Sequence, residues 1–335
     1  MMTPRWIGSA GVVVLDATRV SLTLFRIMVP VILVVKVLDL LGVVGWIASA
    51  FEPLMGLVGL PGDMGLVWAT AVLTNMYGGI VLFASTAPGL GLTTAQVTVI
   101  ACMILVAHSM PVEIAIARKA GVRMRFMIPF RLLSALLLGF LLHRLFCLGG
   151  FLDGPARILW EASGSTGGLG AWGLSQLRNL AAIFLIVLGL IVLMRILDAS
   201  GFTTVMNRAL KPLLTSMGIG GSASTVTILG MVLGISYGGG LIIRAVSTGK
   251  VPPRDVFFSM SLMGLSHSIV EDSLLMMSLG ASLWGVLPAR LAFTWPVIAL
   301  LVTIVGRIPD GSFFRWLFVP PQAGREPGPP EKPAP

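Results

Sequence analysis

Several stretches of about twenty residues in this chain carry few or no charged side chains. A segment of that length and composition can cross the hydrocarbon core of a bilayer as a helix, because a helix satisfies all of its backbone hydrogen bonds internally. The chain is 56% hydrophobic and 11% charged. A soluble domain with this composition would need long helices that are apolar on every face. The pattern therefore predicts an all-α integral membrane protein.

The second half of the chain repeats the first at an offset of 159 or 160 residues. Repeated positions include His, Asp, Tyr-Gly-Gly and Pro-x-Arg, which hydrophobic bias alone would not align, so an internal duplication is indicated. The paired segments are 25–39 with 184–198, MYGG (76–79) with SYGG (236–239), HSMPVE (108–113) with HSIVED (267–272), and PFR (129–131) with PAR (288–290). The predicted division is an interfacial segment (1–19), a first repeat (20–147), a Gly/Ser-rich linker (148–178), a second repeat (179–306) and a Pro-rich cytoplasmic tail (307–335).

The loops between apolar segments place the two copies in opposite orientations. In the first copy the loop after MYGG is uncharged and the loop after HSMPVE is basic, whereas the second copy shows the reverse. Cytoplasmic loops are enriched in Lys and Arg, so the second copy is predicted to be inverted, with both termini cytoplasmic. The basic residues are Arg118, Lys119, Arg123 and Arg125 in the first copy, and Arg244, Lys250 and Arg254 in the second.

An inverted duplication requires an odd number of crossings in each copy, yet each copy shows four apolar segments. The count becomes odd if the Tyr-Gly-Gly segments, about 63–87 and 222–246, enter and leave on the same side. Non-helical backbone at that depth is tolerated where protein or a water-filled cavity shelters it. We predict three full crossings plus a re-entrant hairpin or broken helix in each copy. Eight continuous spans with glycine kinks are the alternative.

Polar residues gather at the predicted membrane midplane. Inverted repeats, broken helices and polar groups at this depth are typical of secondary transporters, and a charged side chain there costs about 2.5–3.5 kcal/mol. The candidate solute- or ion-binding residues are Asn75, Tyr77, Gly78, Gly79, His108, Ser109 and Glu113 in the first copy, and Ser236, Tyr237, Gly238, Gly239, His267, Ser268, Glu271 and Asp272 in the second.

The histidines define the most specific hypothesis. His267 and Glu271 are four residues apart, which places them on one face of a continuous helix. Such a pair could hold a proton, bind a cation or hydrogen-bond a polar solute, and His108, His267 and Glu271 are the candidate metal ligands. Pro111 lies between His108 and Glu113 and is expected to kink the helix and free carbonyl groups. The alternative is that the His–carboxylate pairs only fix helix packing.

Two more pairs lie near opposite membrane faces, Lys36 with Asp39 and Arg195 with Asp198. Each pair is three residues apart and could form a gate-side ion pair. The alternative is that these are helix-end charges whose long side chains reach toward the interface.

These residues resemble the Gate, or nucleoside-recognition, domain. That domain is shared by concentrative nucleoside transporters, the membrane part of the bacterial ferrous-iron transporter, and spore maturation proteins A and B. The resemblance rests on the YGG motifs, the charged loop, and HS…E followed by P-x-R. The chain looks like an A-type and a B-type half fused into one. The resemblance implies inverted repeats with re-entrant hairpins in a bacterial inner (cytoplasmic) membrane. It implies no substrate, because members of the family differ.

The expected function is secondary-type transport of a small polar solute, with a nucleoside-like solute suggested by the resemblance. The only expected cofactor is a coupling ion, H⁺ or Na⁺. The alternatives are a divalent-metal permease for Fe²⁺, Mn²⁺ or Zn²⁺, or a membrane assembly or regulatory protein that transports nothing. An enzyme is not expected, because the sequence holds no HExxH or GxSxG motif.

The expected partners are the lipid bilayer, a small-molecule or ion substrate, and a second copy of this chain if it forms a homo-oligomer. Nucleic acid is not expected, because the net charge of +9 arises mostly from Lys and Arg between apolar segments. The sequence also holds no GxxxxGK[ST] stretch, so the GTPase domain of a complete iron transporter is absent from it.

Overall fold

A computed structural model describes residues 10–158, 168–216, 219, 221–247 and 251–320. Within them the regular elements are helical, which confirms the all-α expectation. The predicted N-terminal segment, linker and tail lie partly outside the described residues. The first half contains α1 (Ala10–Leu40), α2 (Val43–Leu57), α3 (Asp63–Leu73), α4 (Met76–Thr86), a short turn (Ala87–Gly89), α5 (Thr94–Val106), α6 (Met110–Lys119) and α7 (Met124–Gly149). The second half contains α8 (Leu169–Ala199), α9 (Phe202–Ser216), α10 (Gly221–Leu233), α11 (Ile235–Ser247), α12 (Pro253–Leu265), α13 (Glu271–Ser278), a π-helical segment (Gly285–Ala289), α14 (Arg290–Gly306) and α15 (Asp310–Trp316).

The helix boundaries of the first half recur in the second. The helices α1 and α8 begin and end 159 residues apart, and the same is true of α2 with α9 and of α5 with α12. At the Tyr-Gly-Gly motifs the sequences align best at 160, but α4 and α11 also begin 159 residues apart, at Met76 and Ile235. Tyr77 therefore takes the same helical position as Ser236.

Four helices are long and apolar enough to cross a bilayer, and a fifth is added if a bent pair counts as one span. The bent pair lies in α1, where the two parts meet at 41°. The sixth predicted crossing corresponds to α12 and α13, which are separated by residues 266–270. The chain is therefore a multi-pass membrane protein. The spans are Thr94–Lys119, Met124–Gly149, Gly170–Leu193 and Gly285–Gly306, with Gly11–Thr23 and Met28–Leu38 as the bent pair.

The helices α3 and α4 form a short hairpin. Each has 11 residues, or about 16 Å of helix, which is roughly half the hydrocarbon thickness. The chain reverses at Asn75, whose side chain accepts a hydrogen bond from the Gly78 amide at 2.9 Å and so begins α4. At the entrance to the hairpin the Gln96 side chain donates to the Gly59 carbonyl at 3.0 Å, which places that entrance at the end of the molecule where α5 starts.

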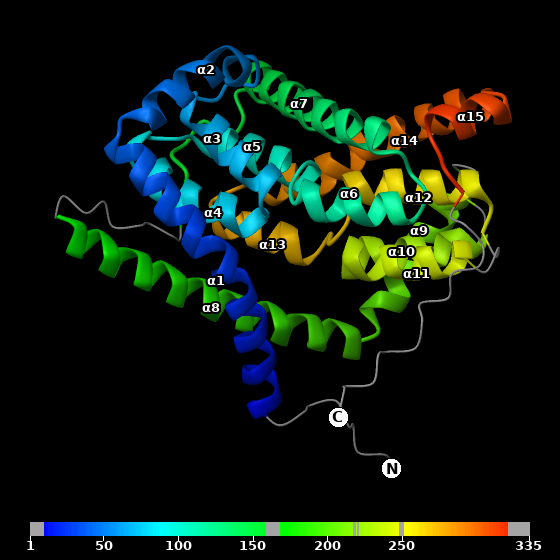
Figure 1. The fold of residues 1–335 in the computed structure, drawn as a ribbon, viewed down its shortest axis with the longest axis horizontal. Coiled ribbons are helices and arrows are strands. Elements are labelled where there is room, and N and C mark those ends of the chain that lie inside the picture. Colours follow the sequence, from blue (N-terminus) through cyan, green and yellow to red (C-terminus); the bar gives the residue numbers. More distant parts are fainter. Residues whose placement is uncertain (1–9, 159–167, 217–218, 220, 248–250, 321–335) are drawn as a thin grey trace, which may run out of the picture.

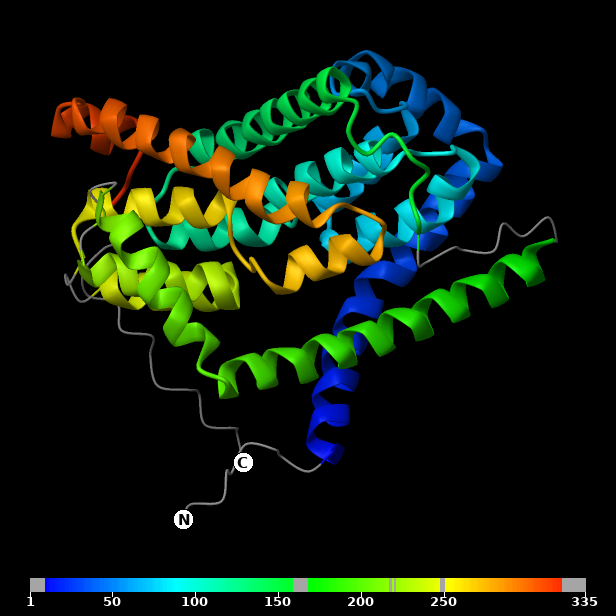
Figure 2. The same ribbon diagram turned by 180° about the vertical axis from the view of Figure 1, so that it is seen from behind.

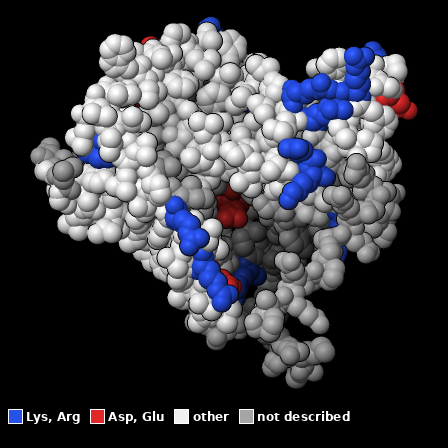
Figure 3. Space-filling view, viewed as in Figure 1, with Lys and Arg blue, Asp and Glu red and all other residues white. Residues whose placement is uncertain are grey.

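The two ends of the bundle differ in charge. At one end Arg123 donates to the Phe314 carbonyl, and Arg254 pairs with Asp310 at 2.7 Å. At the other end the Ala156 amide donates to the Leu92 carbonyl. Figure 3 shows Lys and Arg gathered around α15 and the neighbouring loops. The basic loops of both halves thus lie together, as the positive-inside rule requires if this end is cytoplasmic.

The two broken helices, α5–α6 and α12–α13, occupy the centre of the molecule (Figures 1 and 2). They run in opposite directions, so that α13 contacts α5 while α11 contacts α6. The helices α7 and α14 cover them on one side, through contacts with α5 and α12 respectively. This packing brings the two predicted histidine segments to the same depth.

Candidate functional site

Each half contains a helix that breaks at its histidine. His108 lies between α5 and α6, and His267 lies between α12 and α13. The next residue in each copy, Ser109 or Ser268, has a positive φ of 49° or 45°. A left-handed conformation costs an L-residue roughly 1–2 kcal/mol. The surrounding structure must therefore hold both breaks open.

These two serines give a direct test of the backbone strain. We expect Ser109→Gly to leave stability unchanged or to raise it, because glycine adopts positive φ without a steric penalty. We expect Ser109→Val to lower it by about 1–2 kcal/mol. The comparison is made by thermal unfolding of the purified protein in one detergent. If valine is tolerated as well as glycine, the left-handed conformation is not present in solution.

Two buried arginines hold the broken ends. Each guanidinium donates two hydrogen bonds to carbonyl groups that the break leaves without helical partners. Arg131 on α7 and Arg290 at the start of α14 are each 1% exposed. They come from the repeated Pro-x-Arg motif, which was not among the candidate site residues. The bonds are Arg131 Nε to Val106 O (3.0 Å), Arg131 Nη2 to His108 O (3.3 Å), Arg290 Nε to Leu265 O (3.0 Å) and Arg290 Nη2 to His267 O (2.9 Å).

Hydrogen bonds to the preceding helix fix the orientation of both imidazole rings. His108 Nδ1 lies 2.9 Å from the Ile104 carbonyl, and His267 Nδ1 lies 2.7 Å from the Met263 carbonyl. A carbonyl oxygen only accepts, so each Nδ1 carries the hydrogen and each neutral Nε2 presents a lone pair. The two Nε2 atoms face each other across the two halves at 3.3 Å.

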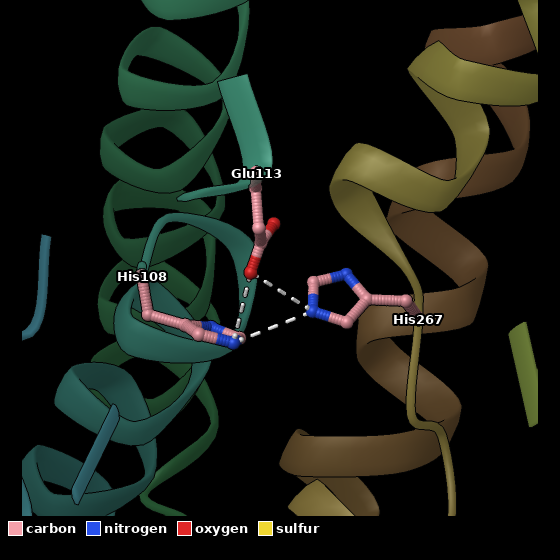
Figure 4. Close-up of side chains that lie close together, drawn as sticks. All are labelled: His108, Glu113 and His267. Carbon is pink, nitrogen blue, oxygen red and sulfur yellow. Dashed lines mark hydrogen bonds and ion pairs between the residues drawn. The ribbon is translucent and has the colours of Figure 1, made fainter. Parts of the chain in front are cut away.

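Glu113, in the first turn of α6, completes the cluster (Figure 4). Its Oε1 lies 3.3 Å from the Nε2 atom of each histidine, and its Oε2 lies 2.6 Å from Arg131 Nη1. All three side chains of the cluster are at most 5% exposed. Three lone-pair atoms this close repel one another unless a positive species lies among them. The geometry therefore calls for a proton or a cation at the junction of the two halves.

The second half has a shorter counterpart of the Glu113–Arg131 pair. Asp272 occupies the position equivalent to Glu113, and its side chain is one methylene shorter. In the described part of the chain, neither Asp272 Oδ2 nor Arg290 Nη1 has a hydrogen-bond partner, although both atoms are buried. The charges acting on Asp272 include His267, Glu271 and Arg290. Figure 3 shows acidic side chains at the base of a hollow over α13.

The expected pairing of His267 with Glu271 was wrong. It required a continuous helix, whereas residues 266–270 are not helical and Glu271 begins α13. His267 contacts Glu113 of the other half instead, so the group of metal-ligand type is His108, Glu113 and His267 rather than one containing Glu271. Glu271 is half-buried. Pro111 lies in the first turn of α6 rather than inside a kinked helix, because the break precedes it. The expected free carbonyl groups are present and bind the arginines.

The other candidate residues have varied surroundings. Tyr77 is half-buried, and Glu271 and Asp272 are the charges acting on it, so the tip of the first hairpin faces α13. The backbone of Gly238 packs against Gly230. Asn75 and Gly78 form the helix cap described above, Gly79 packs on Ala71, Gly239 packs on Ile116, and the side chains of Ser236 and Tyr237 lie outside the described set.

The predicted gate pairs are described only in part. Arg195 Nη2 lies 2.5 Å from Asp16 Oδ2, which links α8 to α1. The Lys36 Nζ atom lies 6.0 Å from the centre of the Trp172 ring. The side chains of Asp39 and Asp198 lie outside the described set. These contacts join α1 to α8, the equivalent helices of the two halves.

The chain is 28% identical to the uncharacterized membrane protein YvoD of Bacillus subtilis (strain 168) over 281 residues. The similarity covers 80% of this chain and 86% of that protein. No protein-family model matches the chain, and no solved structure matches it. The similarity supports a multi-pass membrane protein. The activity has to be argued from the site.

Proposed function

We propose that the protein is a secondary-type transporter that moves a small polar solute through the junction of its two halves, driven by a gradient of H⁺ or Na⁺. The observation that carries the proposal is the buried cluster of His108, Glu113 and His267. Two of its members come from the first half and one comes from the second. A site shared in this way is assembled or taken apart when one half moves against the other, as alternating access requires.

The arrangement of helices supports the same proposal. The two broken helices run antiparallel and meet at their breaks, as expected for inverted repeats related by a twofold axis in the membrane plane. The hairpin α3–α4 is too short to span the bilayer. We therefore assign it as re-entrant, together with its counterpart α10–α11.

The chemistry of the cluster favours a positively charged solute. It presents three acceptor atoms, so a solute must supply positive charge or hydrogen-bond donors. A nucleoside-like solute, which the Gate-domain resemblance suggests, would have to turn N–H or O–H groups toward the cluster. A divalent-metal permease is the second candidate, and the ligand set His108, Glu113 and His267 favours it.

A purely structural role for the site fits less well. Buried polar atoms without partners cost about 1–3 kcal/mol each, and Asp272 Oδ2 and Arg290 Nη1 are two such atoms beside the cluster. A protein whose midplane served only packing would gain stability from apolar residues at these positions. Their presence supports a site that binds a charged or polar species.

Transport can be tested in liposomes that contain the purified protein. Solid-supported-membrane currents would be recorded after jumps of nucleosides or divalent cations, with an H⁺ or Na⁺ gradient across the membrane. We expect a current with at least one solute, and we expect Glu113→Gln to reduce it at least tenfold, because the cluster loses its only full negative charge. His143→Ala changes a histidine of α7 outside the cluster and should leave the current intact. Equal currents in the wild type and Glu113→Gln would exclude the cluster from the transport path.

A further inference from the structure

We propose that His108, Glu113 and His267 bind a divalent transition-metal ion in tetrahedral geometry, with zinc as the best-fitting ion. The inference deepens the proposed function, since it names the transported cation. It rests on that function only for the transport step, because binding itself can be measured without transport. The three ligand atoms would be the two imidazole Nε2 atoms and Glu113 Oε1.

The distances fit one face of a tetrahedron. The three atoms form a triangle with every side 3.3 Å long. In a tetrahedral complex the distance between ligands is about 1.63 times the bond length, so this triangle corresponds to bonds of about 2.0 Å, the usual length for zinc with imidazole nitrogen and carboxylate oxygen. The right angles of an octahedron would require bonds of about 2.3 Å, which is too long for zinc.

The ligand types select the same class of ion. Imidazole nitrogen suits zinc, iron, nickel and copper, whereas magnesium and calcium prefer oxygen ligands. Two of the three ligand atoms here are nitrogen. Three protein ligands leave the fourth position free for water or for a ligand encountered on the way in or out. A carrier has to release its ion, and an incomplete protein shell allows this.

The surroundings of the ligands are those that metal sites need. A metal-bound histidine almost always donates its other N–H to a carbonyl or carboxylate, which fixes the ring. Both histidines do this, through Ile104 O and Met263 O. The oxygen of Glu113 that would not bind the metal contacts Arg131. The three ligand atoms are thus already aimed at one point.

Nearby charges set how tightly the ion is held. The guanidinium of Arg131 opposes a cation, whereas the carboxylate of Asp272, which acts on both His267 and Glu113, favours one. We therefore expect exchangeable binding rather than a structural metal. Asp272→Asn should weaken binding by less than tenfold, since Asp272 acts through its charge and not as one of the three ligands.

Binding is tested on the detergent-solubilised full chain, purified with a histidine-free tag and stripped of metal. The background variant His143→Ala/Cys147→Ser removes an exposed pair, 3.5 Å apart, that could bind zinc on its own. Competition with a chelating dye should show one Zn²⁺ per chain in this background. His108→Ala or His267→Ala should weaken binding at least about 100-fold, since even outer-shell changes cost 10–100-fold.

A second measurement avoids the risk that a variant fails to fold. Co²⁺ is added to the background protein itself, and its visible absorption is recorded, which is intense for tetrahedral and weak for octahedral cobalt. An intense spectrum that Zn²⁺ abolishes supports the site. A weak spectrum, absence of zinc binding, or binding that is unaffected in His108→Ala and His267→Ala overturns it.

The flux assay separates this inference from the proposed function. If a solute moves in liposomes but the protein binds no zinc, the metal inference is wrong and the transporter assignment stands. If zinc binds through the three ligands but neither zinc nor any other solute moves, the metal site stands and the transporter assignment is wrong.

Discussion

Replacing Arg131 with methionine will destabilise the protein by about 3–5 kcal/mol, the usual cost of leaving a buried charge without its partner. The guanidinium contacts Glu113 at 2.6 Å and holds the carbonyl groups of Val106 and His108. Methionine fills much of the same volume but donates no hydrogen bond. The Glu113 carboxylate would then lie buried with no cation beside it. The expected result is a large fall in the thermal unfolding temperature in detergent, and low yield of folded protein.

The equivalent change in the second half is the matched control. Arg290 makes the same two carbonyl contacts, but its Nη1 has no hydrogen-bond partner. Arg290→Met should therefore cost clearly less than Arg131→Met. The double variant Arg131→Met/Glu113→Gln should recover part of the loss, because it removes the unpaired charge. If the two single variants are equally stable and Glu113→Gln rescues nothing, the buried ion pair does not exist.

Replacing Gly238 with valine will produce the second largest effect. A Cβ atom at this position would lie 2.2 Å from the Gly230 Cα and 2.8 Å from its backbone nitrogen. The backbones of α10 and α11 are therefore in direct contact, as is common where membrane helices pack through small residues. Overpacking costs about 1–3 kcal/mol. We expect the upper end of this range, because the two backbones would have to separate for the side chain to fit.

Gly240→Val on the same helix provides the control. It makes the same change in helix propensity, but a Cβ atom there meets nothing within 4 Å. Thermal unfolding of the two variants in the same detergent isolates the helix contact from the propensity. A Gly238→Val protein as stable as Gly240→Val would mean that α10 and α11 are not packed as described.

The duplication and the membrane helices could be predicted from the sequence because they depend on local pattern. Repeated residues at a constant offset place His108 and His267 at equivalent positions, and antiparallel packing of equivalent segments brings them together. The convergence of the two histidines at one depth followed from that pattern alone.

The partner of His267 could not be predicted in the same way. A spacing of four residues pairs His267 with Glu271 on an unbroken helix, and nothing in the local sequence announces that this helix stops at Leu265. The break depends on Arg290, which lies 25 residues further along the chain and holds the free carbonyl groups. The repeated Pro-x-Arg motif was the available signal, since an arginine in an apolar span needs buried partners.

The most direct test is X-ray absorption at the zinc edge, recorded on the zinc-loaded full chain in the His143→Ala/Cys147→Ser background. It reports the ligands of the ion itself, and therefore whether residues of both halves meet at one site. We expect two imidazole ligands and oxygen in a first shell at about 2.0 Å, and only one imidazole after His267→Ala. A spectrum with no imidazole, or one that His267→Ala leaves unchanged, would contradict the assignment of His108, Glu113 and His267 as a shared cation site.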